Sequence, residues 1–262
     1  MTIFVISGFG YVGQATNKTL LHAGISADNI FINDPPKNLI VDKDVWSKAR
    51  WHLVCVPTPS SDQSSVSQYD SSIVDSAINL ARSNWFRGDT VIRSTLEPQT
   101  IQKYLDKDPF ITVWPELLRK ASWEEDAINP VFSIAGGANS NILNLEFNDK
   151  FKIKNVLFSP VEACIVKLAI NSLLAARTIQ AYNLKKYVDA LGCDYNNVAD
   201  MLSKEPRLGY SHWMQPGPDG EYGYGGSCFP KDTSAMAQSM INADVHNSYA
   251  EWAHIVNKLV RG

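Results

Sequence analysis

Short apolar runs alternate with amphipathic stretches over roughly the first 160 residues of the chain. The apolar runs are rich in Val and Ile and are bounded by Gly, Pro, Ser or Asp, as buried strands commonly are. They occupy residues 3–7, 30–33, 52–56, 90–94, 111–114 and 132–136. The amphipathic stretches predict helices over residues 11–23, 71–85, 97–105 and 139–148. Alternation of strand and helix predicts an α/β fold with a doubly wound, parallel sheet.

The pattern changes after Pro160. Residues 161–191 contain no Gly or Pro, and their apolar positions recur at helical spacing, so they predict one long helix. Further helices are expected near residues 194–203, 231–242 and 246–260, with a long ordered loop over 204–227. We therefore expect two domains, residues 1–160 and an all-helical domain at 161–262. The polar segment 60–68 is expected to be a mobile loop at a strand end, where ligand loops commonly lie.

Composition narrows the class of function. The chain has 262 residues, 45% of them hydrophobic, and a formal net charge of -3. This balance is ordinary for a globular protein, and no basic excess suggests binding to nucleic acid or to an acidic membrane surface. The apolar runs are too short to span a bilayer, and the N-terminus lacks the features of a signal peptide. Four cysteines without metal-ligand spacing favour a reducing, cytoplasmic setting and no metal site.

A glycine-rich turn follows the first predicted strand and opens the first predicted helix. It reads Gly8-Phe9-Gly10-Tyr11-Val12-Gly13, the G-x-G-x-x-G spacing of a Rossmann dinucleotide-binding turn. The free N–H groups of the helix N-terminus would face a pyrophosphate. Asp34 ends the second strand about 20 residues later, where a carboxylate accepts from ribose hydroxyls and disfavours a 2′-phosphate. The turn thus predicts NAD binding, although Lys37 points weakly towards NADP, and an unrelated glycine turn is the alternative.

A second glycine-rich segment leads to a cysteine. Residues 222–232 read YGYGGSCFPKD, with Cys228 directly before a predicted helix. A helix N-terminus and nearby cations favour the thiolate form of such a cysteine. A buried, unreactive cysteine is the more common case, however, and we expect that for Cys55, Cys164 and Cys193.

Seven segments in order resemble the UDP-glucose/GDP-mannose dehydrogenase family. They are GFGYVG (8–13), VCVPTPS (54–60), STLEPQT (94–100), WPELLRKAS (114–122), VKLAINSLLAAR (166–177), EPRLG (205–209) and GYGGSCFPKD (223–232). The resemblance implies a four-electron, NAD-dependent oxidation of the C6 alcohol of a nucleotide sugar to a carboxylate, with UDP-glucose as the type substrate. It also implies that Cys228 carries thiohemiacetal and thioester intermediates.

The same resemblance assigns roles to residues of this chain. Lys167 would assist alcohol deprotonation and stabilise the oxyanion together with Asn171, which lies one turn further along the long helix. Glu116 and Thr95 would hold the hydrolytic water, and Asp232 would orient the lysine and the water network. Taken singly, these residues also fit a solvated helix face, a loop carboxylate and a turn residue.

The implied contact residues form two sets. Cofactor contacts are expected at Gly8, Gly10, Tyr11, Val12, Gly13, Asp34, Pro57, Thr58, Ser94 and Thr95. Substrate contacts are expected at Glu116, Leu117, Leu118, Lys167, Asn171, Arg207, Tyr224, Gly225 and Lys231. Arg207 resembles an arginine that family members lend to a neighbouring subunit, and the long helix is expected to form a homodimer.

The chain also departs from the family pattern. Family members continue into a second Rossmann-like domain that grips the nucleotide, so we expect a shortened form without that domain. Lys120 and Ala121 stand where the family commonly has Glu-Gly. Two alternatives stay open: the same chemistry on a smaller substrate, or a non-catalytic NAD-binding remnant that serves as a scaffold.

Overall fold

The computed structural model describes residues 2–59, 69–147, 150–157, 159–209 and 211–261. These residues divide between two compact units, one within Met1–Pro59 and Tyr69–Lys167 and the other within Leu168–Gly262. The predicted loop at 60–68 lies outside the described residues. No helix in the described ranges is long and apolar enough to cross a membrane.

A seven-stranded sheet forms the centre of the first unit. Its strands are β1 (Phe4–Ser7), β2 (Ile30–Asn33), β3 (Trp51–Val54), β4 (Asp89–Ile92), β5 (Thr112–Val113), β6 (Ile134–Gly136) and β7 (Asn155–Leu157). Their spatial order is β2-β1-β3-β4-β5-β6-β7. All neighbours run parallel except β5 and β6, which meet antiparallel through Val113 and Gly136. The expected fold class is therefore confirmed, with one antiparallel pair and one short edge strand, β7, that the apolar pattern did not indicate.

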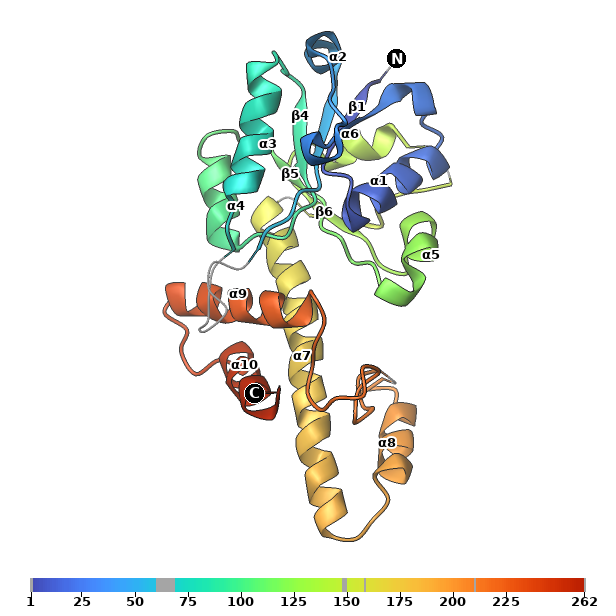
Figure 1. Cartoon of the computed structure of the whole chain (residues 1–262), viewed down its shortest axis with the longest axis vertical. Helices are drawn as coiled ribbons and strands as arrows, with labels where there is room; N and C mark the ends of the chain where they lie inside the picture. The colour runs from blue at the N-terminus through green and yellow to red at the C-terminus, as the bar shows by residue number, and fades with distance from the viewer. Residues whose placement is uncertain (1, 60–68, 148–149, 158, 210, 262) are drawn as a thin grey trace. The chain divides into compact units, whose positions relative to one another are not determined.

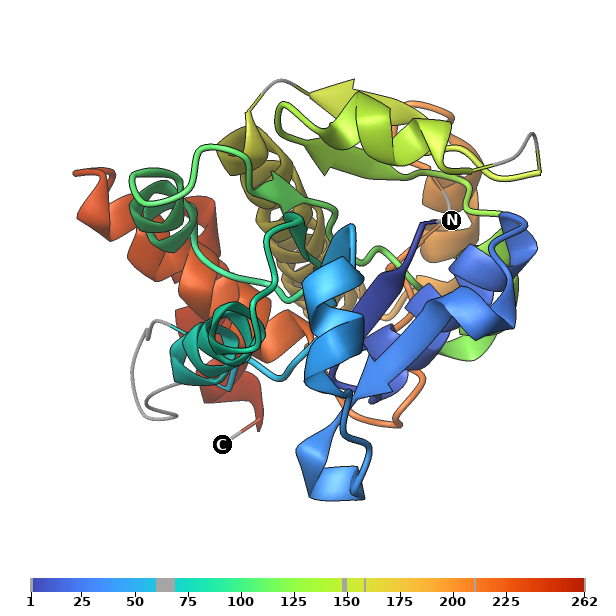
Figure 2. The ribbon, with the colours of Figure 1, turned by 90° about the horizontal axis from the view of Figure 1, so that it is seen from above.

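Helices cover both faces of this sheet, as Figure 2 shows in the view from above. They are α1 (Tyr11–His22), α2 (Lys43–Lys48), α3 (Ser72–Ser83), α4 (Pro98–Leu105), α5 (Trp123–Ile128) and α6 (Ser140–Leu145). Leu20 of α1 and Leu143 of α6 pack with β-strand residues in one buried cluster. Trp46 of α2 and Ala81 of α3 pack with Val5 in another. A doubly wound sheet with two separate cores results.

The parallel strands place their carboxyl ends at one edge of the sheet, and there the functional segments begin. The glycine turn follows β1, and Asp34 follows β2. Residues 55–59 follow β3, and Ser94 and Thr95 come shortly after β4. In open α/β sheets this edge is where ligands bind.

The second unit is helical (Figure 1). Its helices are most of α7 (Pro160–Ala190), followed by α8 (Tyr195–Lys204), α9 (Phe229–Asn242) and α10 (Tyr249–Arg261). With 31 residues, α7 is roughly 46 Å long at ~1.5 Å per residue. In the core of the second unit, Ala175, Ala176 and Ile179 of α7 pack against Tyr224 and Ala253. The predicted long helix, the three shorter helices and the intervening loop are confirmed to within three residues at each end.

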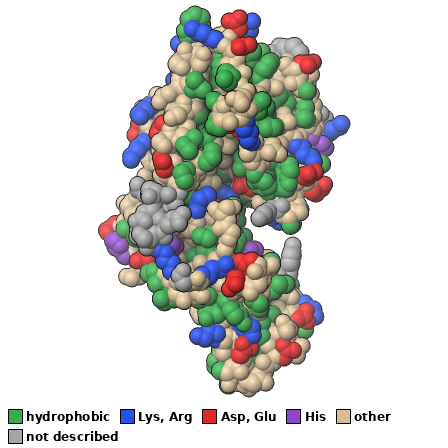
Figure 3. Space-filling view, viewed as in Figure 1, with side chains coloured by type: hydrophobic (Ala, Val, Ile, Leu, Met, Phe, Trp, Pro, Cys, Tyr) green, Lys and Arg blue, Asp and Glu red, His purple; other side chains and the backbone are tan. Residues whose placement is uncertain are grey.

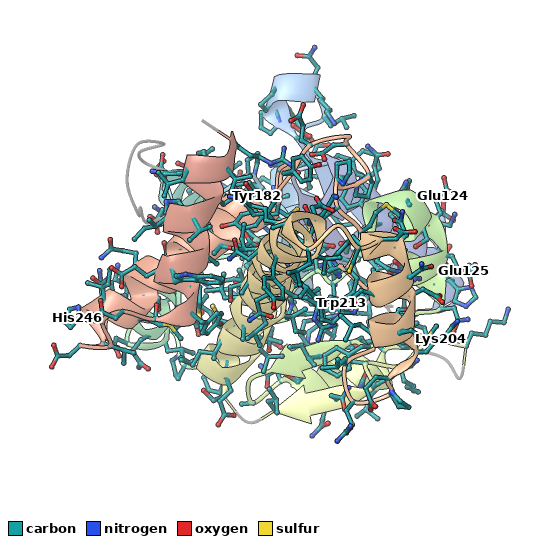
Figure 4. All side chains as sticks on the ribbon, turned by 90° about the horizontal axis from the view of Figure 1, so that it is seen from below. Glu124, Glu125, Tyr182, Lys204, Trp213 and His246 are labelled. Carbon is teal, nitrogen blue, oxygen red and sulfur yellow. The ribbon has the colours of Figure 1, made fainter. Side chains whose placement is uncertain are left out.

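Aromatic contacts fasten the long loop of the second unit to α7. Tyr182, labelled in Figure 4, lies on α7, and its ring centroid is 5.4 Å from that of Tyr222. Trp213, also labelled, donates from Nε1 to Gly209 O at 2.9 Å and lies beneath Arg177. The loop between α8 and α9 is thus ordered by packing, as its Gly, Pro and Tyr content predicted.

Candidate functional site

The three glycines of the turn after β1 meet different surroundings. A Cβ on Gly8, where φ is +87°, would lie 2.8 Å from Cys55 O. A Cβ on Gly13 would lie 2.0 Å from Gly8 O, so α1 can approach the turn only because this residue has no side chain. A Cβ on Gly10 would meet nothing within 4 Å. Packing within the protein therefore explains why residues 8 and 13 are glycine. At Gly10 there is open space next to the N-terminus of α1, which begins with Tyr11 and Val12.

Asp34 closes the turn from the side of β2. Its Oδ2 accepts the Phe9 N–H at 2.8 Å and lies 3.7 Å from Lys37 Nζ. The side chain of Asp34 is mostly buried, and that of Lys37 is half exposed. The carboxylate therefore lies beside the glycine turn, where it accepts a hydrogen bond from a backbone N–H and lies near a lysine ammonium.

The ends of β3 and β4 are tied to each other. Ser94 Oγ donates to Val56 O at 2.7 Å. Thr58 is buried, Pro57 is exposed, and Thr95 is half-buried. These four predicted contact residues thus belong to two neighbouring strand ends of the first unit.

A buried ion pair lies within the first unit. Lys167 Nζ is 3.5 Å from Glu116 Oε2, and the two side chains are 5% and 10% exposed. The Leu118 N–H donates to the other carboxylate oxygen, Glu116 Oε1. Because a buried ion pair is held in low dielectric, losing either partner leaves an uncompensated charge. The structure thus brings these two predicted site residues together.

Arg93 is a residue that the sequence reasoning missed. Its guanidinium is buried and lies 3.9 Å above the Trp114 ring, and its Nε and Nη1 have no hydrogen-bond partner among the described residues. Burial lowers the pKa of this guanidinium, while Cys55 and Glu116 act in the opposite direction. The signal in the sequence is an arginine within the otherwise apolar strand predicted over residues 90–94.

The second unit holds another polar cluster around Asp232. Asn171 Nδ2 donates to Asp232 Oδ2 at 2.6 Å, and Lys231 Nζ lies 2.5 Å from Asp232 Oδ1. Asp232 is 1% exposed and Asn171 is 9% exposed. The buried carboxylate is therefore paired and hydrogen-bonded, as a buried charge requires. Because α7 is continuous, Asn171 lies one helical turn beyond Lys167 on the same face of that helix.

Cys228 is the residue directly before α9 and is exposed. Its carbonyl oxygen accepts the Asp232 N–H at 2.8 Å, which makes it the N-cap of the helix. Its Sγ lies 3.7 Å from Ser227 Oγ. The thiol is thus accessible at a helix N-terminus, a position where helix dipoles favour an anion.

The remaining predicted substrate residues have varied surroundings. Arg207 is exposed and pairs with Glu205, its Nε lying 2.7 Å from Oε1. The Tyr224 ring is 3% exposed and belongs to the core of the second unit, and Gly225 is half-buried. Leu117 and Leu118 are half-buried in the first unit.

The other cysteines differ from one another. Cys55 and Cys164 are buried, as expected for packing residues. Cys193, however, is exposed, so the expectation that it packs inside the protein was wrong. It lies in the short turn between α7 and α8, where three of its neighbours are exposed as well.

Charge is spread rather than gathered on the face drawn in Figure 3, where basic and acidic side chains are interspersed. Within the described ranges, no group of three or more His, Cys, Asp or Glu side chains is placed to hold a metal ion.

Residues 161–259 match the central domain of the UDP-glucose/GDP-mannose dehydrogenase family. Among curated proteins, the chain is 27% identical to UDP-glucose 6-dehydrogenase TuaD of Bacillus subtilis over 157 residues, 56% of this chain and 33% of that protein. It is 26% identical to GDP-mannose 6-dehydrogenase of Pseudomonas putida over 211 residues, 74% of this chain and 47% of that protein. The chain thus spans less than half the length of these two relatives.

Solved structures share the fold. A UDP-glucose dehydrogenase from Pyrobaculum islandicum matches with a TM-score of 0.80 at 20% identity, over 99% of this chain and 68% of that chain. A 3-hydroxyisobutyrate dehydrogenase from Mycobacterium tuberculosis matches with a TM-score of 0.76 at 13% identity, over 99% of this chain and 93% of that chain. Dehydrogenases with different substrates therefore share this fold. The match to the central domain and the similarity to the curated relatives distinguish among them. On these matches, residues 161–259 belong to the central domain of the UDP-glucose/GDP-mannose dehydrogenase family, and the chain is a distant relative of the curated dehydrogenases.

Proposed function

We propose that this protein is an NAD-dependent oxidoreductase that oxidises the C6 alcohol of a nucleotide sugar to a carboxylate through Cys228. The observation that carries the proposal is the exposed Cys228 thiol at the start of α9, whose first turn also contains Asp232, buried and bonded to Asn171. An accessible cysteine at a helix N-terminus is suited to attack an aldehyde and form a covalent intermediate. The match to the family's central domain supports the same chemistry.

The turn after β1 fits a dinucleotide. The open space at Gly10 admits a pyrophosphate, and Asp34 offers a carboxylate for the ribose hydroxyls. We propose that Tyr11, Val12 and Gly13 present the helix N-terminus to the phosphates, and that Pro57, Thr58, Ser94 and Thr95 line the remainder of the site. When bound, NAD accepts the hydride in each of the two oxidations. The family resemblance and the carboxylate of Asp34 favour NAD over NADP, because the carboxylate would repel a 2′-phosphate.

Side chains of the protein would stabilise the negatively charged oxygen and supply the nucleophile. The Lys167 ammonium would donate to the alcohol oxygen and stabilise its negative charge as the alcohol proton passes to water, and Asn171 would donate to the same oxygen. The Cys228 thiolate would attack the aldehyde carbon and form a C–S bond, giving a thiohemiacetal that is then oxidised to a thioester.

Hydrolysis completes the cycle. Glu116 would remove a proton from a water held by Thr95, and the resulting hydroxide would attack the thioester carbon. The C–S bond breaks, the sugar leaves as a carboxylate, and Cys228 returns as a thiolate. Asp232 would keep the polar network oriented throughout.

For the substrate, we propose a UDP-sugar or a related nucleotide sugar. Leu117, Leu118, Gly225 and Lys231 would contribute contacts, and Arg207, exposed on its loop, would reach the site of a second subunit. Tyr224 is instead buried in the core of the second unit. The two domains expected from the sequence would divide this work, with NAD bound by residues 1–160 and the cysteine loop carried by residues 161–262.

The test is NADH formation by the purified protein with UDP-glucose, UDP-N-acetylglucosamine, UDP-N-acetylmannosamine and GDP-mannose. We expect two NADH per sugar with one of them. Cys228→Ala should lower turnover at least about 1,000-fold. Cys193→Ala, which removes the other exposed thiol, is the matched control and should retain full turnover.

Other outcomes decide between the alternatives. Full turnover by Cys228→Ala would refute the covalent mechanism. NAD binding without turnover of any of the four sugars would refute the proposed substrate class and leave a smaller substrate or a scaffold role.

A further inference from the structure

The loop that carries Cys228 is held by the last helix of the second unit. Asn257 of α10 lies opposite Tyr224, and its side-chain amide pairs with the backbone of that residue in both directions. The Tyr224 N–H donates to Asn257 Oδ1 at 2.8 Å, and Asn257 Nδ2 donates to Tyr224 O at 3.0 Å. Asn257 is 8% exposed, so this pairing is buried. The amide therefore occupies both polar groups of one peptide residue, as a neighbouring strand would.

The glycines of the loop make room for this contact. At Gly223, where φ is +75°, a Cβ would lie 2.5 Å from Asn257 Oδ1. At Gly225, a Cβ would lie 2.6 Å from Arg261 Nη1. Both positions are therefore glycine because α10 approaches the loop closely.

Arg261 strengthens the same attachment one helical turn later. Its Nη2 lies 2.8 Å from Asp219 Oδ2, in the second half of the loop between α8 and α9. Hydrogen bonding to Arg261 is the main cause that lowers the pKa of Asp219. The Tyr224 ring adds an apolar anchor, because it is buried between α7 and α10. The loop is thus held at Asp219 and Tyr224 before it reaches the cysteine.

Cys228 comes four residues after Tyr224, and one of the intervening residues, Gly226, has a φ of +82°. We propose that Asn257 is a positioning residue for Cys228, which fixes the loop backbone so that the thiol stands in a single place at the start of α9. This inference rests on the proposed function, because it assumes that Cys228 is the nucleophile. Misplacing a reacting group by about 1 Å can cost about 100-fold in rate.

Two substitutions test the role of Asn257. Asn257→Leu keeps the approximate size of the side chain and removes both hydrogen bonds, and we expect kcat to fall about 100-fold. The affinity for NAD should stay unchanged, because the glycine turn belongs to the other unit. Leu259→Ala, on an exposed position of the same helix, is the control and should leave kcat unchanged.

Asn257→Asp supplies a signature that a purely structural role would lack. Its ionised carboxylate can accept from the Tyr224 N–H but repels Tyr224 O, whereas its protonated form donates to that oxygen as the amide does. We therefore expect kcat of Asn257→Asp, divided by kcat of the unmodified protein, to rise as the pH falls. A ratio that is flat with pH, or an Asn257→Leu protein with full kcat, would overturn the proposal.

Hydrogen exchange separates failure of this inference from failure of the proposed function. Exchange of the amides of residues 222–228 should accelerate at least about tenfold in Asn257→Leu, while exchange within α7 stays unchanged. This measurement needs no turnover. Equal exchange in the two proteins would refute the attachment itself, whereas turnover by Cys228→Ala would refute only the role of the cysteine.

Discussion

Gly8, Gly10 and Gly13 share one motif but are glycine for different reasons. The sequence predicted their common place after a strand and before a helix, and the spacing alone was sufficient for that. What each Cβ would meet depends on atoms from distant segments, such as the carbonyl oxygen of Cys55. Arg93 and Asn257 were missed for the same reason, because their surroundings come from residues far along the chain.

Alanine substitutions should separate packing from binding at this turn. Gly13→Ala places a Cβ against a carbonyl oxygen and should destabilise the protein by about 3 kcal/mol or more. Gly10→Ala meets no protein atom, so its free energy of unfolding should change by less than about 0.5 kcal/mol. Its NAD affinity should nevertheless fall at least about tenfold, because the methyl group occupies the space proposed for the pyrophosphate.

Urea unfolding and NAD titration of both variants would provide these two values. Unchanged NAD affinity in Gly10→Ala would contradict the proposed cofactor site. A stable Gly13→Ala protein would contradict the close packing of α1 on the turn.

At the scale of elements, long periodic segments were predicted well and short ones poorly. Residues 161–191 lack Gly and Pro, and the structure has α7 at Pro160–Ala190. In contrast, α2 and α5 have six residues each and β7 has three, too few to establish a period. Tertiary contacts rather than local pattern decide whether such short segments form.

One face of α7 carries exposed apolar side chains. Leu173 and Tyr187, which are 55% and 64% exposed, lie two heptads apart and therefore on nearly the same face of the helix. This face supports the expected homodimer, which stays a prediction. Leu173→Glu should weaken the dimer at least about tenfold, because it places a charge in an apolar contact.

Sedimentation equilibrium of the two proteins would measure that change. The matched control is Leu259→Glu, because Leu259 is 81% exposed but lies on α10. An equal effect of both substitutions, or a monomeric unmodified protein, would contradict an α7 interface.

At the scale of the whole molecule, the sequence predicted a sheet domain followed by a helical domain. Along the chain, the boundary between the two compact units falls within α7, between Lys167 and Leu168. No break in the sequence marks that point, because the helix continues through it. The change in periodicity predicts two separate cores. The residue at which one core ends and the next begins depends on tertiary contacts, which the hydrophobic pattern does not reveal.

Global stability should depend on pH through His52. This residue of β3 is fully buried, and its Nε2 lies 2.8 Å from Ser7 Oγ. Burial is the main cause that lowers the pKa of His52 from 6.5 to about 3. Below pH 6.5, His52 is protonated in the unfolded chain but stays neutral in the folded protein until about pH 3. The free energy of unfolding therefore decreases as the pH falls through this range.

The loss should approach about 1.4 kcal/mol per pH unit from this group, well below pH 6.5. Urea unfolding at pH 7.5 and pH 5 measures it. His52→Gln should show a smaller decrease than the unmodified protein. His246→Gln, at an exposed position labelled in Figure 4, should show the same decrease as the unmodified protein. Identical decreases in all three proteins would contradict the role of His52.

The attachment of the cysteine loop to α10 also has a consequence for biosynthesis. Cys228 leaves the ribosome about 30 residues before Asn257 and Arg261 do. At roughly 5–20 residues per second, this difference leaves the nascent loop unattached for a few seconds. During that interval the thiol is accessible but not yet held in place. A newly made chain would therefore pass through a stage in which oxidants can reach Cys228 before it can catalyse.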